Sequence, residues 1–228
     1  MRKGDAKKQE ILTVSEELFC RQGYQETSVQ DILDILGTSK GSFYHHFESK
    51  GQVLEVLCAN RAVKAAEETE KQMPGIIGTM DRVNAVLSGF IPLKRSQKDF
   101  MVMLLPQLFR QEGRTVCSAY QDALTKAFEE PLRRELDRAI REGLLFPPGG
   151  DNQADIVMAL LNRCWVTAGG ILLESSDSED RSVPGRLLDE LKRYRQILER
   201  LLNAPYGSIE LIDLEEWLAL REAVSRKK

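Results

Sequence analysis

The chain has 228 residues, enough for one or two domains and for a core that needs neither a disulfide nor a metal to fold. Hydrophobic residues make up 42% and charged residues 29% of the sequence, which is typical of a globular protein and excludes a disordered or collagen-like chain. The 32 basic and 35 acidic side chains give a net charge of −3, so nucleic-acid binding requires a local surface rather than bulk charge.

The sequence predicts a cytoplasmic protein without a membrane span, a secretory leader or a cofactor. The longest uninterrupted apolar runs, at residues 101–105 and 156–161, are far shorter than the ~20 residues of a spanning helix, and acidic residues interrupt the N-terminal segment. The four cysteines are scattered without a Cys-x-x-Cys pair, so we expect buried, inert thiols, with redox sensing by one or two of them as the alternative.

The first two predicted helices lie before residue 37. Apolar residues recur at helical spacing from Ile11 to Phe19, and Gly23 is a natural C-terminal stop. Thr27 is predicted to cap the second helix, with Gln30 closing a capping box. Its apolar residues occupy positions i, i+3, i+4 and i+7, which predicts one buried face.

A third and a fourth helix are predicted to follow. Gly37 ends the second helix, and Thr38-Ser39 cap a third helix that runs to about Phe47, with Phe43 and Phe47 assigned to the core. The third helix would be ~12 Å long, about the width of a DNA major groove. A fourth helix is expected over residues 49–72, capped by Ser49. Two short helices joined by a glycine-containing turn are typical of a helix-turn-helix.

The charge pattern indicates which part of this segment faces a polyanion. Residues 1–50 carry seven basic and eight acidic side chains, and the acidic ones are concentrated on the first two helices. Residues 37–50 carry Lys40 and Lys50 against Glu48 alone, together with both histidines of the chain. Backbone N–H groups at the starts of the second and fourth helices are further candidates for phosphate contacts.

Several segments of residues 6–60 together carry a family resemblance. They are Ala6-Lys7-Lys8-Gln9-Glu10-Ile11-Leu12, Glu17-Leu18-Phe19, Gly23-Tyr24, Thr27-Ser28-Val29-Gln30-Asp31-Ile32 and Ser39-Lys40-Gly41-Ser42-Phe43-Tyr44-His45-His46-Phe47-Glu48-Ser49-Lys50. This pattern resembles the N-terminal domain of TetR-family transcriptional regulators. The chain departs from it at Leu36-Gly37-Thr38, where Ala-Gly-Val is common, and at Gly51, where glutamate is frequent.

The resemblance implies a DNA-binding surface. Residues of the third helix and the turn before it would meet bases or phosphates, His45, His46 and Lys50 would mainly hold the phosphate backbone, and the start of the second helix would lie against it. The candidate set is Ser28, Val29, Thr38, Ser39, Lys40, Gly41, Ser42, Tyr44, His45, His46 and Lys50. The alternative is a domain that is vestigial or used for protein contact.

The rest of the chain is also predicted to be helical, so the fold class is all-α. Helical blocks are expected at about 79–91, 97–112, 115–143, 151–174, 184–203 and 213–225, with Pro131 as a kink or break and residues 208–212 as a short extended segment. We expect two domains, a helix-turn-helix DNA-binding domain over residues 1–50 and a helical effector-binding and dimerisation domain over residues 51–228.

The blocks 151–174 and 184–203 carry wide apolar stripes, which must be buried in a core or between subunits. The resemblance implies a homodimer formed by C-terminal helices, whereas the residues alone leave an intramolecular core as an equal alternative. The dimer-interface candidates are Leu160, Leu161, Leu191, Tyr194 and Leu198.

Large apolar side chains in the same region are candidates for an effector pocket. They are Met80, Phe90, Met103, Phe109, Tyr120, Phe128 and Trp165, and ordinary core packing is the competing interpretation for each. Their apolar surroundings favour an apolar or aromatic effector, while Arg110, Arg114 or Arg163 would suit an acidic one.

Together these features favour a ligand-responsive, DNA-binding transcriptional regulator. A twofold dimer would read two half-sites ~34–36 Å apart, or a small number of helical turns apart, in a near-palindromic operator. The long helix over residues 49–72 would transmit effector binding to the DNA-binding domain, and repression follows from the resemblance. The alternative is a helical ligand-binding or protein-interaction module without DNA binding. An enzyme is disfavoured because the sequence has no glycine-rich phosphate loop and no Gly-x-Ser-x-Gly motif.

Overall fold

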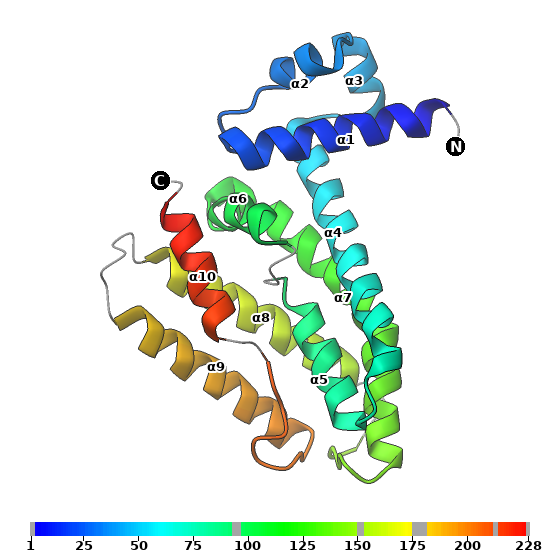
Figure 1. The fold of residues 1–228 in the computed structure, drawn as a ribbon, viewed down its shortest axis with the longest axis vertical. Helices are drawn as coiled ribbons and strands as arrows, with labels where there is room; N and C mark the ends of the chain where they lie inside the picture. The colour runs from blue at the N-terminus through cyan, green and yellow to red at the C-terminus, as the bar shows by residue number, and fades with distance from the viewer. Residues whose placement is uncertain (1–2, 93–96, 150–152, 175–181, 212–213, 227–228) are drawn as a thin grey trace. The chain divides into compact units, whose positions relative to one another are not determined.

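The computed structural model describes residues 3–92, 97–149, 153–174, 182–211 and 214–226, and every regular element in these ranges is a helix (Figure 1). The elements are α1 (Lys3–Gln22), α2 (Val29–Leu36), α3 (Lys40–His46), α4 (Lys50–Gln72), η1 (Met73–Gly75), α5 (Thr79–Phe90), α6 (Lys98–Leu108), η3 (Gln111–Gly113), α7 (Arg114–Arg141), α8 (Gln153–Glu174), α9 (Ser182–Leu201) and α10 (Leu214–Ser225). The predicted all-α fold class is confirmed.

Most predicted helices are found close to their expected bounds, with two differences. The block expected at 97–112 ends as an α-helix at Leu108, and the short η3 turn leads into α7. Pro131 lies inside α7, which remains one helix from Arg114 to Arg141, so this proline does not break it. Residues 208–211 are not helical, whereas residue 212 and the polar run 175–180 lie outside the described residues.

The start of α2 differs from its prediction by one residue. Ser28, rather than Thr27, is the N-cap: its hydroxyl accepts a hydrogen bond from the amide of Asp31 at 3.1 Å, and the Asp31 carboxylate accepts from the amide of Ser28 at 2.7 Å. Thr27 is fully buried, and its hydroxyl donates to the carbonyl of Gly23 at 2.8 Å instead. Gly37 ends α2 in the left-handed region with φ of 56°, a conformation that glycine adopts without strain.

The chain divides into two compact units, Met1–Arg61 with Asp99–Tyr120, and Ala62–Lys98 with Gln121–Lys228. This division differs from the expected boundary after residue 50, because the first half of α4 and a later segment belong with the helix-turn-helix. In this unit α1 packs on α2, and α2 on α3 (Figure 1). Phe43 and Phe47 are buried, as predicted.

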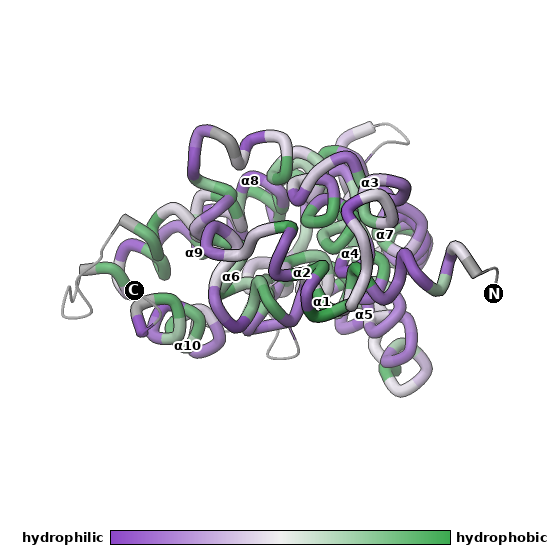
Figure 2. Tube along the Cα trace, turned by 90° about the horizontal axis from the view of Figure 1, so that it is seen from above, coloured by the Kyte–Doolittle hydropathy of each residue, from purple (hydrophilic) through white to green (hydrophobic). Residues whose placement is uncertain are grey.

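The second unit contains the large helical body. Helix α8 packs against α9, and the largest buried side chains of this unit include Trp165, Trp217, Phe90 and Phe128. The rings of Phe90 and Phe128 meet edge to face with centroids 5.6 Å apart, a favoured aromatic arrangement. Hydrophobic and hydrophilic residues alternate along the helices in Figure 2, the pattern of helices that each bury one side.

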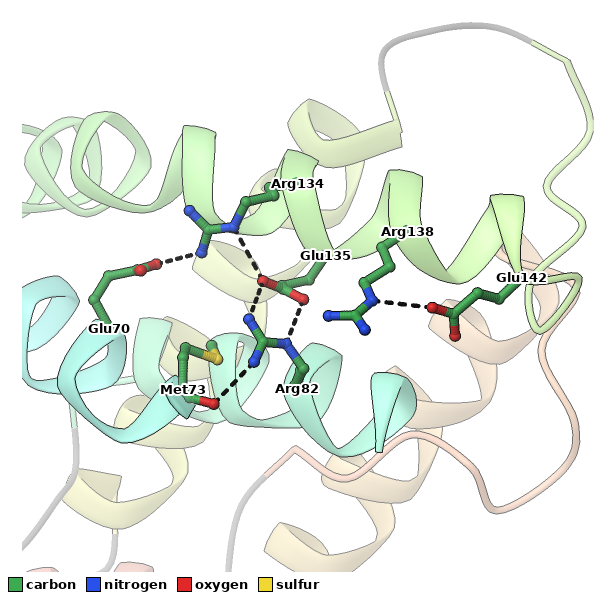
Figure 3. A network of polar contacts seen from close by, with 7 residues as sticks. All are labelled: Glu70, Met73, Arg82, Arg134, Glu135, Arg138 and Glu142. Carbon is green, nitrogen blue, oxygen red and sulfur yellow. Dashed lines mark hydrogen bonds and ion pairs between the residues drawn. The ribbon is translucent and has the colours of Figure 1, made fainter. Parts of the chain in front are cut away.

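A buried carboxylate joins three helices of this unit (Figure 3). Glu135 of α7, with 1% of its side chain exposed, accepts hydrogen bonds from Arg82 Nε at 2.8 Å and Nη2 at 3.0 Å, and from Arg134 Nε at 3.0 Å. Arg82 also donates to the carbonyl of Met73 at 2.8 Å, and Arg134 donates to Glu70 at 2.7 Å. The hydrogen bonds from Arg82 hold the pKa of Glu135 below its ordinary value. The network therefore fastens the C-terminal end of α4 to α5 and α7.

Helix α8 is more apolar than its short uninterrupted runs suggested. By length and composition alone, Gln153–Leu173 is able to cross a membrane, the only such helix in the described ranges. Half of its most apolar window is buried, and the helix packs along α9. A core helix of a folded body has these same properties.

Candidate nucleic-acid interface

Helix α3 presents a polar surface beside its buried aromatic face. Lys40, Gly41 and His45 are exposed, and the Tyr44 side chain is 54% exposed although it is aromatic. Phe43, next in the chain, is fully buried and meets Tyr44 edge to face at 5.4 Å. Burial of one face thus leaves the opposite side of α3 free to contact a partner.

The other predicted α3 residues lie close to this exposed side. Thr38, Ser42 and His46 are half-buried, and the ring of His46 meets that of His45 at 4.9 Å. Ser39 is the N-cap of α3, and its hydroxyl accepts from the amide of Ser42 at 3.3 Å. The Ser39 side chain is therefore exposed and also caps the helix.

Ser28 and Val29 lie at the start of α2, exposed and half-buried respectively. Ser28 and Asp31 form a capping box. The Asp31 carboxylate accepts hydrogen bonds from the amide of Ser28 at 2.7 Å and from its hydroxyl at 2.8 Å, and these two bonds hold the pKa of the carboxyl below its ordinary value. Asp31 was missed as a contributor to this surface, although the Ser-x-x-Asp signature was present in the sequence. The segment contains two overlapping capping signatures, Thr27 with Gln30 and Ser28 with Asp31, and only the second forms the cap.

Lys50 is turned toward its own chain. Its ammonium donates to the carbonyl oxygens of Tyr24 at 2.6 Å, Thr27 at 2.7 Å and Gln25 at 3.4 Å, and it lies 4.3 Å from the centre of the Tyr24 ring. Burial lowers the pKa of Lys50, while the charges of Glu26 and Asp31 oppose that shift. No local pattern predicts these contacts, because the partners lie 23–26 residues away in the chain.

The effector-pocket candidates are divided between the two units. Met103, Phe109 and Tyr120 belong to the unit with the helix-turn-helix, whereas the remaining four, Met80, Phe90, Phe128 and Trp165, belong to the body. Five of the seven are buried at 5% exposure or less, Met80 is half-buried, and Phe109 is 44% exposed. The structure therefore places most of these side chains in the packed core of their own unit.

A cleft in the body has a different lining. It has a volume of about 650 Å³ and lies between α5, α9 and residues 207–211. Leu191 and Ile209 contribute apolar surface, and Lys192 and Arg195 contribute positive charge. Asn84 of α5 fixes the segment opposite by donating to the carbonyl of Ser208 at 2.9 Å. Such a volume is within the range of small-molecule sites.

The dimer-interface candidates require a correction. Leu161 and Leu198 are fully buried in the single chain, and Leu191 and Tyr194 are 7% and 5% exposed, so the chain itself covers most of these four side chains, with Leu191 at the wall of the cleft. Leu160 alone of the five is half-buried. The apolar stripes were correctly identified, but periodicity does not reveal whether the chain itself covers a stripe.

Three of the four cysteines have unreactive surroundings. Burial raises the pKa of Cys58 and Cys117, and it raises the pKa of Cys164 to about 12. Little reactive thiolate forms at neutral pH under these conditions. These positions fit the expected inert thiols.

The fold and this surface define an all-helical protein with an N-terminal helix-turn-helix domain. The family model described as "Bacterial regulatory proteins, tetR family" matches residues 11–57, which include α2, α3 and the capping residues described above. Over these residues the chain is similar to the TetR family of bacterial regulatory proteins.

Two curated relatives share parts of the sequence. YerO of Bacillus subtilis, an HTH-type transcriptional regulator, is 29% identical over 149 residues, which cover 63% of this chain and 47% of YerO. The HTH-type transcriptional repressor KstR2 of Mycolicibacterium smegmatis is 40% identical over 50 residues, which cover 22% of this chain and 24% of KstR2. The chain thus spans about half of one relative and a quarter of the other.

Solved structures share the fold over most of the chain. A TetR-family transcriptional regulator of Pectobacterium atrosepticum matches with a TM-score of 0.62 and 18% identity, covering 90% of this chain and 99% of that one. The transcriptional regulator FadR of Bacillus subtilis, solved in complex with stearoyl-CoA, matches with a TM-score of 0.53 and 17% identity, covering 89% and 99% of the two chains. At such identities, the likeness concerns the fold.

Proposed function

We propose that this protein is a homodimeric, ligand-responsive transcriptional repressor that binds a near-palindromic DNA operator. The observation that carries the proposal is the exposed polar side of α3 within a helix-turn-helix that matches the TetR family model. Phosphate contacts would set the position of the domain on the duplex, and a few α3 side chains would select the sequence. As a DNA-binding regulator it would act in the cytoplasm.

Residues of α3 and its preceding turn would make the base contacts. Tyr44 has a large exposed ring, and Lys40 is an exposed cation at the start of α3 for which the described contacts include no ion pair. His45 and His46 would approach the phosphate backbone. Because the recognition helix has seven residues, each recognised half-site should be short.

A second copy of the chain would cover the outer faces of α8 and α9. Ile156 on α8 is 46% exposed and Ile197 on α9 is 39% exposed, and Leu160 is half-buried beside Ile156 on the same face of α8. Exposed aliphatic side chains on two packed helices favour association through a twofold interface. Ile156→Arg should therefore yield a folded monomer, which sizing with light scattering would detect.

A small molecule would release the operator by favouring a non-binding arrangement of the protein. FadR, with which this chain shares its fold, was solved with stearoyl-CoA. In this chain, the body offers a cleft of about 650 Å³ with both apolar and charged lining. An effector coupled to DNA binding typically changes affinity through 1–3 kcal/mol of coupling free energy, or roughly 5- to 150-fold.

Fluorescence anisotropy with the DNA that flanks the protein's own gene tests the proposal. An unrelated duplex of equal length serves as the control, and both are titrated at two salt concentrations. We expect a preference of at least ~10³ for the flanking DNA. Weak, salt-dependent binding to both duplexes would indicate a working domain with the wrong operator. No binding to either at low salt would favour a ligand-binding or protein-interaction module instead.

A further inference from the structure

The ammonium group of Lys50 is bound by carbonyl oxygens of its own chain. An ammonium group has three N–H donors, and Lys50 Nζ has three carbonyl oxygens within 3.4 Å, those of Tyr24, Gln25 and Thr27. The face of the Tyr24 ring lies 4.3 Å away and attracts the same charge. All the donors of Lys50 therefore have partners within the chain.

The segment that Lys50 holds is the connection between α1 and α2. Tyr24 to Thr27 follow the end of α1 at Gln22, and Ser28 then caps α2. Three further contacts involve this segment: the Thr27 hydroxyl donates to Gly23, the amide of Thr27 donates to Tyr24 at 3.4 Å, and the Gln25 side chain donates to that of Gln107 in α6 at 3.0 Å. Lys50, at the first position of α4, provides a contact across more than twenty residues of sequence.

The position of α2 affects the surface that would meet DNA. Ser28 and Val29 stand at its start, and α2 packs directly against α3. A displacement of the Tyr24–Thr27 connection would move the first turn of α2, and α3 with its exposed Tyr44 would lose part of its support. Preorganisation of a recognition surface raises affinity by reducing the ordering cost of binding.

A phosphate contact by Lys50 would have a cost in this arrangement. Its ammonium would have to leave at least one carbonyl oxygen, and that acceptor, which is partly buried for Tyr24 and Thr27, would lose its partner. Lys40 differs in each respect, because it is exposed and has no ion pair among the described contacts. Both residues are lysines within the same motif, so Lys40 is a matched control for Lys50.

We propose that Lys50 is a positioning residue of the DNA-binding surface, which fixes the Tyr24–Thr27 connection and the start of α2 and donates no hydrogen bond to a DNA phosphate. This inference rests on the proposed DNA-binding function. It distinguishes fixing the Tyr24–Thr27 connection from contacting a DNA phosphate, the role that the family resemblance implied for Lys50. A positive charge near the recognition helix is not by itself evidence of a phosphate contact.

The test compares Lys50→Met, Lys50→Arg and Lys40→Met with the parent protein. The first readout is the dependence of DNA affinity on salt concentration, measured per folded protein, because each lost phosphate contact reduces the slope of log K against log salt by about one. The second readout is amide hydrogen exchange of residues 23–31 in the DNA-free protein, compared with exchange of α9. Circular dichroism confirms that each variant is folded.

We expect Lys40→Met to reduce the salt slope by about one and to leave exchange unchanged. Lys50→Met should keep the parental slope, accelerate exchange at residues 23–31 but not in α9, and weaken binding by roughly fivefold, comparable to the loss of a helix cap. Lys50→Arg should behave like Lys50→Met, because a planar guanidinium cannot direct donors at the same three carbonyls although it binds phosphate well.

Two outcomes would overturn this assignment. One is a slope reduced by one in Lys50→Met without a change in exchange, and the other is parental affinity in Lys50→Arg while exchange accelerates. Either result makes Lys50 a phosphate ligand. If the parent protein binds no duplex, the proposed function fails and the DNA-positioning role fails with it. Exchange in Lys50→Met then still determines whether Lys50 holds the connection.

Discussion

Replacement of Glu135 by glutamine tests how strongly the buried network holds the body together. The carboxylate accepts three N–H groups from Arg82 and Arg134, and its side chain is 1% exposed. Glutamine has nearly the same shape, but it is neutral, and its amide nitrogen would face the N–H donors of a guanidinium. Glu135→Gln thus leaves the Arg82 cation inside the body without its counter-charge.

The size of the effect follows from the burial of the partners. Removing one partner of a buried ion pair costs about 3–5 kcal/mol. The side chain of Arg82 is 17% exposed and that of Arg134 is 43% exposed, so water screens the remaining charges in part. We therefore expect a loss near the lower limit, about 3 kcal/mol, which for a protein of this size lowers the melting temperature by about 6–12 °C.

Urea denaturation followed by tryptophan fluorescence measures this loss directly. Both tryptophans of the chain, Trp165 and Trp217, are buried in the same unit as Glu135, so their emission reports the unfolding of the body. Glu129→Gln is the control: Glu129 lies on the same helix and pairs with Arg133 at 2.7 Å, but their side chains are 47% and 42% exposed. An exposed pair contributes about 0.2–1 kcal/mol.

The same comparison has a defined dependence on pH. Because the arginines lower the pKa of Glu135, its contribution is fully present above the ordinary pKa of glutamate, about 4.3, and is lost as pH falls through the lowered value. The difference between parent and Glu135→Gln should therefore shrink in acid. A Glu135→Gln variant within about 1 kcal/mol of Glu129→Gln at neutral pH would refute the reasoning.

Three further predictions concern single side chains. Tyr44→Ala should weaken operator binding at least about tenfold in anisotropy while changing stability by less than about 0.5 kcal/mol, because the ring is 54% exposed; parental DNA affinity would exclude it from the interface. Gly89→Ala should destabilise the body by about 1–3 kcal/mol in urea, since a Cβ there would lie 2.2 Å from Thr69 Oγ1; a second change, Thr69→Ala, should recover part of the loss. Asp31→Asn should accelerate hydrogen exchange in α2 at neutral pH, and its difference from the parent should vanish as pH falls through the lowered pKa of Asp31; equal exchange at pH 7 would exclude a stabilising bond to Ser28.

Local features of the sequence were sufficient for the helices and for the motif. Gly37 ends a helix, Ser39 caps the next, and Phe43 and Phe47 face the core, as their spacing predicted. Helix ends and caps depend on residues three or four positions apart, so a short window of sequence contains the determining interactions. The one-residue error at Thr27 arose where two such windows overlapped.

The partners of each side chain depended on contacts between distant segments. Nothing near Lys50 in the sequence indicates that its ammonium meets carbonyl groups more than twenty residues earlier. Likewise, Leu161 and Leu198 were correctly placed on apolar stripes, but only the packing of α8 against α9 decided that the chain itself buries them. The sequence by itself determined the helices, the capping signals and the family motif, because those interactions are local. Tertiary structure alone decided which groups are satisfied within the chain and which remain for a partner, because burial and hydrogen bonding depend on the packing of segments far apart in the sequence.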